Sequence, residues 1–173
     1  SSADRVITYG RSGDLSWHGE YRSTGMRVEF SFEGKSIGTD LSVHSEFEVA
    51  NIAAAMAAFL SMGHSIDKLI DLLPQLASVP GRMQKIPGPK GCPAVILDYA
   101  HTPDALERVL RACRRHCEGR LICLIGCGGG RDAGKRPIMG RVAIENSDVC
   151  YFTSDNPRDE DPLEILTSMT SSI

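Results

Sequence analysis

The sequence has no long hydrophobic run, because its longest apolar stretch covers only nine residues, 52–60. A transmembrane helix needs about 20 such residues, which excludes this stretch as a membrane span. An excess of basic charge is also missing: 19 Lys and Arg stand against 22 Asp and Glu, for a net charge of −3. Proteins that bind nucleic acids are usually strongly basic. We therefore expect no membrane and no nucleic acid as partner and, without a signal-peptide pattern, a cytoplasmic protein.

Closely spaced cysteine pairs are missing too, since none of the six cysteines forms a C-x-x-C motif. That spacing is common in zinc modules and in redox-active proteins. Cys123, Cys127 and Cys150 instead lie in or beside apolar runs, where a thiol packs like a small hydrophobic side chain. We expect reduced core thiols and no metal site. A zinc site that combines His116 with cysteines between 113 and 127 is the less favoured alternative.

An initiator methionine is absent at Ser1, and the helical pattern of 162–173 has no stop signal. We therefore expect a fragment of a longer chain. Its 173 residues, 42% of them hydrophobic, are enough for the core of one domain or of two small units.

The composition divides the sequence in two. Residues 79–93 contain four prolines and three glycines, which is typical of a linker. We therefore predict one domain over 1–78, a linker over 79–93 and a second domain over 94–173. In the first domain, apolar periodicity and caps such as Ser65 predict strands and then helices. The expected elements are strands over 5–9, 26–32 and 36–43, and helices over 46–62 and 65–76.

The second domain alternates between short apolar strands and amphipathic helices. The expected strands cover 94–98, 121–125 and 149–153, and the helices cover 102–117, 135–146 and 162 onward. Apolar strands without alternation, separated by helices, are typical of a parallel sheet that helices cover on both faces. Ligands bind beyond the carboxyl ends of such strands. Each of the three strand ends in this sequence is followed by polar or glycine-rich residues.

A glycine-rich loop follows the second strand. Gly129-x-x-x-x-Gly134-Lys135 nearly matches a P-loop, but Arg136 stands where the magnesium-binding hydroxyl belongs, and Gly126-x-Gly128-x-x-Arg131 lacks the third glycine of a dinucleotide fingerprint. We reject both motifs. A glycine-rich turn before a helix, with the basic side chains of Arg131, Lys135 and Arg136, can still hold an anion. The alternative is a flexible loop with solvated charges.

Two further strand ends carry polar groups. Asp98 and His101 follow the first strand, where a carboxylate can accept ribose hydroxyls and an imidazole can contact phosphate. An Asp–His pair can also act as a general base. The alternative is that Asp98 caps the helix that follows. After the third strand, Asp155-Asn156-Pro157-Arg158 offers a carboxylate for an ammonium group and a guanidinium for a carboxylate, as a zwitterionic amino acid requires. The alternative is an ordinary β-turn.

Four motifs follow one another along the chain: Gly81-Arg82-Met83-Gln84; Asp98-Tyr99-Ala100-His101-Thr102-Pro103-Asp104-Ala105-Leu106; Gly126-Cys127-Gly128-Gly129 with Arg131-Asp132 and Lys135-Arg136-Pro137; and Asp155-Asn156-Pro157-Arg158. Together they resemble the Mur ligases of peptidoglycan synthesis, and within that family the members that add a diamino acid. The resemblance covers essentially the whole chain and is specific from Phe47 onward.

The resemblance implies a fold and an activity. Residues 1–78 resemble the end of the family's central ATPase domain, and 94–173 resemble the first part of its C-terminal domain, an α/β domain with a Rossmann-like parallel sheet. The family uses ATP with Mg²⁺ to turn the D-glutamyl carboxylate of UDP-N-acetylmuramoyl-L-alanyl-D-glutamate into an acyl-phosphate. The amine of meso-2,6-diaminopimelate then attacks it. The family's P-loop and magnesium-binding acids have no counterpart here, so we expect no catalytic residue and no metal ligand in this chain, and no activity of the chain alone.

The resemblance also assigns site residues. ATP-binding roles are implied for Asn51, near adenine, and for Arg82, Asp98 and His101. A diamino-acid site is implied for Arg131 and for the turn Asp155, Asn156, Pro157 and Arg158, which goes with meso-diaminopimelate.

Two residues depart from the family pattern: Glu48 replaces an asparagine, and Gly130 replaces the aspartate of Gly-Gly-Asp-Arg-Asp. We expect the first to affect the adenine pocket and the second to loosen the loop that presents Arg131. The alternatives are a folylpolyglutamate synthetase-like ligase and a non-catalytic ligand-binding fragment of the same fold.

Overall fold

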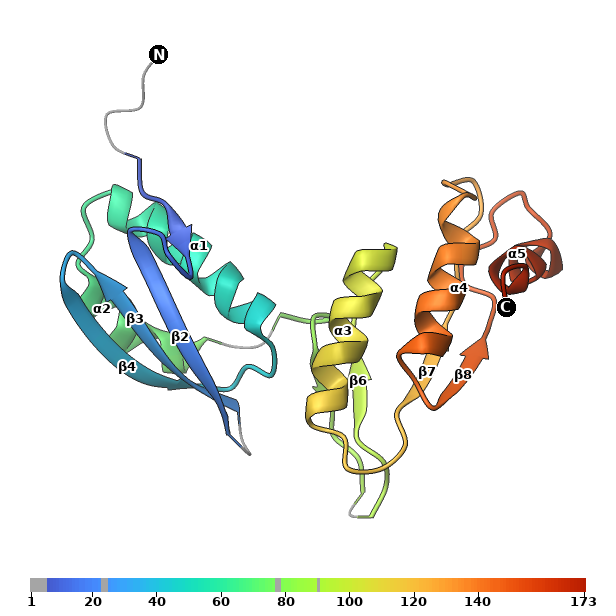
Figure 1. Ribbon diagram of the computed structural model, residues 1–173, viewed down its shortest axis with the longest axis horizontal. Coiled ribbons are helices and arrows are strands. Elements are labelled where there is room, and N and C mark those ends of the chain that lie inside the picture. The colour runs from blue at the N-terminus through green and yellow to red at the C-terminus, as the bar shows by residue number, and fades with distance from the viewer. Residues whose placement is uncertain (1–5, 23–24, 77–78, 90) are drawn as a thin grey trace. The chain divides into compact units, whose positions relative to one another are not determined.

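The computed structural model describes residues 6–22, 25–76, 79–89 and 91–173 (Figure 1). The chain divides into two compact units, Ser1–Ile96 and Leu97–Ile173, which are described separately below. The predicted linker over 79–93 ends shortly before this division. Within the described residues, no helix combines the length and the apolar composition that crossing a bilayer requires.

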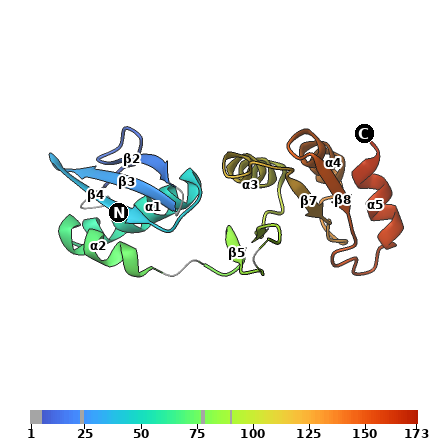
Figure 2. The ribbon, with the colours of Figure 1, turned by 90° about the horizontal axis from the view of Figure 1, so that it is seen from below.

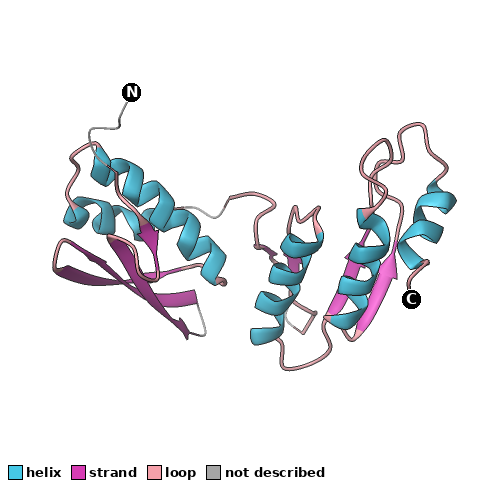
Figure 3. Ribbon diagram, turned by 45° about the horizontal axis from the view of Figure 1, so that its top comes forward, coloured by secondary structure: helices cyan, strands magenta, loops and turns pink. Residues whose placement is uncertain are grey.

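The first unit packs helices against one face of a sheet (Figure 3). Its elements in order are β1 (Tyr9–Gly10), β2 (Leu15–Arg22), β3 (Gly25–Phe32), β4 (Lys35–Leu41), α1 (Glu46–Ser61), α2 (Ile66–Leu72) and the 3₁₀ helix η1 (Leu73–Gln75). The strands lie in sequence order, and only the β1–β2 pair is parallel. Alternate residues of β3 from Met26 to Phe32 are buried, as the period of two predicts. The predicted hairpin is therefore confirmed.

The start of the chain differs from the prediction. Residue 5 lies outside the described residues, and 6–8 are not in a strand, because the side chain of Asp14 binds both the amide and the hydroxyl of Thr8 at 2.8 and 2.7 Å. The strand β2 was not predicted. Its buried Leu15 and Trp17 alternate with polar residues, so the period-two signal was present.

Two caps fix the helices of the first unit. Ser65 accepts the amide of Lys68 and caps α2, as predicted, and η1 extends the helix with Pro74 in its first turn. Ser45 caps α1 by accepting the amide of Glu48, and the Glu48 carboxylate in turn accepts the amide of His44 at 2.9 Å and the hydroxyl of Ser45 at 2.8 Å. Glu48, which we predicted to affect the adenine pocket, therefore has a structural role at the start of α1.

The strand predicted over 94–98 is β6 (Val95–Leu97), and it pairs with β5 (Gln84–Ile86) in a separate two-stranded sheet. We expected it to join the parallel sheet of the second unit, and this expectation was wrong in detail. The pairing with β5 closes only a short intervening segment, which loses less conformational entropy than a long connection. The segment predicted as a linker thus contains a strand.

The second unit is an α/β unit with a parallel strand pair. Its elements are α3 (Pro103–Arg115), β7 (Ile122–Ile125), α4 (Lys135–Glu145), β8 (Val149–Phe152) and α5 (Pro162–Thr170). β7 and β8 run parallel with Cys123 opposite Cys150, and Figure 2 shows α4 and α5 beside this pair. The predicted alternation of strands and helices and the α/β fold class are confirmed.

The helices cover one face of the β7–β8 pair. Cys123 and Ile125 are buried with residues of α3, α4 and α5, whereas Leu124 and Tyr151 on the other face are 71% and 58% exposed. The prediction of a sheet covered on both faces is therefore wrong for this chain. The unbroken apolar pattern of the strand could not distinguish a covered face from an uncovered one, because apolar side chains occur on both.

Candidate functional site: the loops beyond the strand ends

Three loops of the second unit lie next to one another beyond the carboxyl ends of their strands. The ammonium group of Lys135, at the start of α4, donates to the carbonyl of His101 at 2.7 Å. The amide of Gly129 donates to the carbonyl of Asn156 at 2.8 Å. These bonds join the 98–101 loop to the start of α4, and the glycine-rich loop to the turn after β8. These three loops are therefore joined to one another. For the loops after β7 and β8 this follows from their parallel pairing, whereas the 98–101 loop follows β6, which lies outside that pair.

Asp98 does not cap the helix that follows it. Its carboxylate accepts the amide of Ala100 at 2.8 Å, and the N-cap of α3 is Thr102, which accepts the amide of Ala105. The capping alternative for Asp98 is therefore contradicted. His101 is exposed, packs edge-on against Tyr99 with ring centroids 5.4 Å apart, and has its Nδ1 3.1 Å from the Tyr99 carbonyl. The loop after β6 thus carries the carboxylate of Asp98 and the imidazole of His101, and local hydrogen bonds hold its backbone.

The glycines after β7 permit close packing against the turn after β8. A Cβ on Gly129 would lie 1.9 Å from the carbonyl oxygen of Pro157, and one on Gly126 would lie 2.6 Å from that of Thr153. Both contacts are with backbone atoms, so only glycine fits. Gly130 adopts a left-handed conformation with φ of 61°. Glycine adopts it without strain, and aspartate is among the few other residues that tolerate it, which accounts for both residue types at this position.

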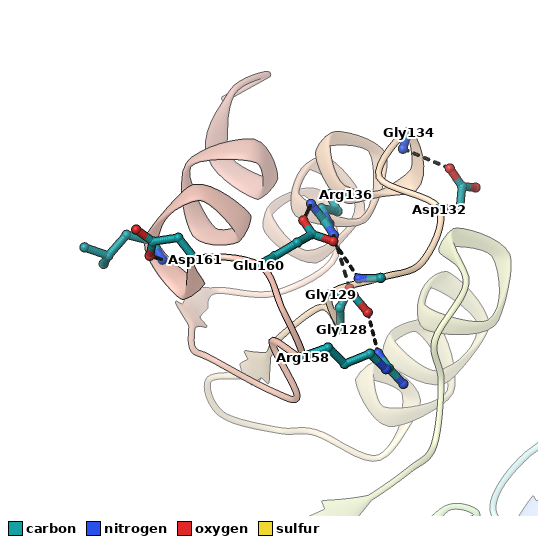
Figure 4. A network of polar contacts seen from close by, with 10 residues as sticks. Gly128, Gly129, Asp132, Gly134, Arg136, Arg158, Glu160 and Asp161 are labelled. Atoms are coloured by element: carbon teal, nitrogen blue, oxygen red, sulfur yellow. Dashed lines mark hydrogen bonds and ion pairs between the residues drawn. The ribbon is translucent and has the colours of Figure 1, made fainter.

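The anion expected in the glycine-rich loop is provided by the protein itself. The carboxylate of Glu160 accepts the amide of Gly130 at 2.6 Å and forms two bonds with the guanidinium of Arg136, at 2.8 and 2.9 Å (Figure 4). The Arg136 contact lowers the pKa of Glu160 below its ordinary value, and the Gly130 amide lowers it further. The prediction of an external anion is therefore wrong for Arg136, which binds an internal carboxylate, and it stays a prediction for Arg131 and Lys135. The prediction followed from the local motif, whereas the partner lies 24 residues further along the chain.

The turn after β8 holds Arg158 against the glycine-rich loop. The guanidinium of Arg158 donates to the carbonyl of Gly129, and its amide donates to the side chain of Asn156 at 3.3 Å. Its backbone is left-handed, with φ of 50°, an uncommon conformation for a residue with a side chain. Asp155, Asn156 and Arg158 are all exposed, as is Arg131. The segment is thus a turn that also presents a carboxylate, an amide and a guanidinium to solvent.

The other ATP-site candidates belong to the first unit. Asn51 is exposed on α1, and Arg82 is exposed beside the buried Met83. The amide of Gly81 donates to the side chain of Gln84 at 2.8 Å, which orders this short segment. Asn51 and Arg82 therefore belong to a different unit from Asp98 and His101.

The thiols have the character of core side chains rather than ligands. Cys123 and Cys127 are buried, as predicted, and Cys150 is half-buried. Burial raises the pKa of Cys123 to about 12 and that of Cys113 to about 11, so the thiolate form that binds metals is suppressed. Among the described residues, no group of three or more His, Cys, Asp and Glu side chains is placed to hold a metal ion.

Sequence reasoning missed Glu160 and the structural role of Arg136. Arg136 lies in the first turn of α4 and Glu160 in the segment after β8. No characteristic sequence spacing indicates a contact between two such residues. The only available signal was the length of the polar segment 153–161, which is longer than a tight turn needs.

The comparisons with known proteins agree in pointing to one family. A family model described as "Mur ligase, glutamate ligase domain" matches residues 81–172. A UDP-N-acetylmuramoyl-L-alanyl-D-glutamate--2,6-diaminopimelate ligase from Ectopseudomonas mendocina is 50% identical over 123 residues, which are 71% of this chain and 25% of the relative. The corresponding ligase from Synechococcus elongatus is 46% identical over 128 residues, 74% of this chain and 26% of the relative. The chain thus spans about a quarter of the length of these relatives.

Solved structures extend the similarity to both units. A structure of a UDP-N-acetylmuramoyl-L-alanyl-D-glutamate--2,6-diaminopimelate ligase matches 98% of this chain and 35% of its own, with 36% identity and a TM-score of 0.58. A MurF ligase from Thermotoga maritima in complex with ADP matches 92% and 37%, with 22% identity and a TM-score of 0.69. A folylpolyglutamate synthase from the same organism matches 91% and 37%, with 19% identity and a TM-score of 0.65. The last two likenesses show the fold alone.

Proposed function

The chain belongs to the Mur ligase family, and from this premise we propose that it is part of a cytoplasmic, ATP-dependent amide ligase of peptidoglycan synthesis. The proposed reaction joins an amine of meso-2,6-diaminopimelate to the D-glutamyl carboxylate of UDP-N-acetylmuramoyl-L-alanyl-D-glutamate. The names of the two relatives with 50% and 46% identity support this choice.

The observation that carries the proposal is the turn 155–158 fixed against the glycine-rich loop. Arg158 donates to the Gly129 carbonyl through one nitrogen. A guanidinium has five N–H groups, so the remaining ones can form a bidentate pair with the distal carboxylate of diaminopimelate. Asp155 is exposed in the same turn and can accept an ammonium group. The turn thus offers both charges that the distal amino-acid end of the substrate requires.

The nucleotide side of the proposed site includes the loop after β6. Asp98 is an acceptor suited to ribose hydroxyls, and His101 and Lys135 are close enough to share one phosphate-facing edge, since Lys135 binds the His101 carbonyl. ATP-binding roles for Asn51 and Arg82 are proposed from the family motifs alone. ATP, with magnesium, supplies the phosphoryl group that activates the carboxylate. We assign no residue of this chain to magnesium.

In this proposal the chain's own residues bind and orient the amine substrate. The ion pairs at Asp155 and Arg158 hold the distal end of diaminopimelate, which leaves its other amine directed at the activated carboxylate. Such orientation converts an encounter of two molecules into a reaction within one complex. No residue described here is assigned as general base.

L-Lysine lacks the distal carboxylate of diaminopimelate, and the expected selectivity follows from this difference. Arg158 is exposed and already bonded to Gly129, so with lysine bound its charge is not left buried and unpaired. The discrimination therefore corresponds to the lost bidentate pair alone, roughly 1.5–3 kcal/mol, which is about tenfold to somewhat more than a hundredfold.

The test is amide formation by the complete ligase that carries these residues. The assay supplies ATP, magnesium, the UDP-linked dipeptide and either meso-diaminopimelate or L-lysine, and follows ADP release and product mass. We expect ligation of diaminopimelate with at least about tenfold higher kcat/KM than for lysine. Absence of ligation, or equal use of lysine, contradicts the proposed function.

A further inference from the structure

Arg136 is the one charged side chain that is buried among the described residues, with 4% of its surface exposed. Burial of a charge is unfavourable unless the charge is paired. Here the guanidinium forms a bidentate ion pair with Glu160 and also donates to the carbonyl of Gly128 at 3.3 Å. This arrangement specifies the distance between the start of α4 and the segment after β8.

Glu160 connects three segments through one carboxylate. It binds the guanidinium of Arg136, accepts the amide of Gly130, and lies two residues after Arg158 in the turn (Figure 4). The turn itself is closed by the Glu160 amide, which donates to the Pro157 carbonyl at 3.0 Å. A shift of Glu160 therefore moves the backbone that carries Arg158.

The same carboxylate also holds the loop that Arg158 contacts. Gly130 follows Gly129, whose carbonyl accepts the Arg158 guanidinium. Loss of the Glu160–Gly130 bond would release that carbonyl and the guanidinium together. Both ends of the Arg158 contact thus depend on the Arg136–Glu160 pair.

We propose that Arg136 and Glu160 are positioning residues for the diamino-acid site, which hold the guanidinium of Arg158 in place for the distal carboxylate of the substrate. Neither residue contacts the substrate in this assignment. The inference rests on the proposed function and adds to it two residues that affect substrate affinity without contacting the substrate.

The chain contains a matched control for such a pair. Asp148 accepts the amide of Leu121 at 2.6 Å and a guanidinium nitrogen of Arg114 at 2.8 Å. It therefore has the same kinds of partner as Glu160, but it lies before β8, at the opposite end of the strands from the three loops. Its loss tests stability without touching the site.

The experiment compares the wild-type complete ligase with E160Q, R136K and D148N. For each protein we measure KM for meso-diaminopimelate, KM for ATP and the thermal midpoint. E160Q should raise KM for diaminopimelate about tenfold or more, because small displacements of a binding group weaken substrate alignment, and should change KM for ATP less than about twofold. R136K keeps the charge without the planar fork and should lie between wild type and E160Q. D148N should lower the thermal midpoint and leave both KM values unchanged.

Each outcome separates the two proposals. If wild type ligates diaminopimelate but E160Q and R136K alter only the thermal midpoint, as D148N does, the pair is merely structural and the inference is wrong. A parallel rise of KM for ATP contradicts it as well. If E160Q does not fold, R136K alone decides between these results. A wild-type enzyme that does not ligate diaminopimelate overturns the proposed function, and the inference with it.

Discussion

Replacing Gly129 by alanine tests the close approach between the glycine-rich loop and the turn after β8. The new Cβ would lie 1.9 Å from the Pro157 carbonyl oxygen and 2.7 Å from its carbon, whereas ordinary contacts begin near 3.4 Å. Backbone atoms cannot rotate away as a side chain can, so loop and turn must separate by about 1.5 Å. That displacement breaks the 2.8 Å bond between the Gly129 amide and the Asn156 carbonyl.

The expected loss of stability follows from these two effects. Overpacking costs about 1–3 kcal/mol, and a lost backbone hydrogen bond costs about 1 kcal/mol. G129A should therefore lower the free energy of unfolding by about 2–4 kcal/mol, which for a unit of this size lowers the thermal midpoint by roughly 10 °C or more.

The assay is urea unfolding of the 173-residue chain, followed by circular dichroism. G119A is the matched control, because a Cβ on Gly119 meets nothing within 4 Å, and it should change the free energy of unfolding by less than about 0.5 kcal/mol. Equal stability of G129A and G119A would refute the packing of loop against turn described here.

Three further predictions concern catalysis. In the complete ligase, R158A should lower kcat/KM for diaminopimelate by about tenfold to a hundredfold and leave KM for ATP unchanged; steady-state kinetics with both amino acids check this, and a retained preference over lysine contradicts it. D98A should raise KM for ATP by an amount that corresponds to about 1–3 kcal/mol, with KM for diaminopimelate little changed; unaltered ATP kinetics would remove Asp98 from the nucleotide site. The 173-residue chain alone should form no amide product from ATP, and measurable turnover by the purified chain would show that it contains a phosphate-binding site we did not recognise.

The sequence predicted those features that depend on neighbours along the chain. The hairpin of β3 and β4, the cap at Ser65 and the helices α3 and α4 all follow from periodicity and capping within a few residues. The proximity of the loops after β7 and β8 followed from their parallel pairing. Each of these rules links residue type to local backbone geometry, so no partner from elsewhere in the chain was required.

The features that were missed depend on distant partners. The basic residues around the start of α4 suggested an external anion, but Glu160, which lies 24 residues after Arg136, binds Arg136 and the Gly130 amide. The glycine-rich turn suggested an anion site, but Gly126 and Gly129 are required by close contact with the backbone after β8. Equally, β6 has the apolar composition of a central strand and pairs with β5 instead. The composition of a segment indicates which side chains can be buried. Only the tertiary structure determines which partners they pack against.

Lowering the pH should reduce the stability of the second unit because Glu160 becomes protonated, and the E160Q variant tests this. Arg136 and the Gly130 amide lower the pKa of Glu160 in the folded chain below the ordinary value of 4.5. A carboxylate with a lowered folded-state pKa stabilises the fold above its unfolded-state pKa, and that contribution is lost as the pH falls through the folded value. E160Q should therefore be less stable than wild type at pH 7, and the difference in urea midpoint should shrink below about pH 4.5 and vanish once the wild-type carboxylate is protonated. E118Q, which removes an exposed carboxylate from the same unit, controls for net charge and should show little difference at any pH. A gap between E160Q and wild type that keeps the same size from about pH 7 down to pH 2–3 would mean that the charge of Glu160 does not stabilise the unit.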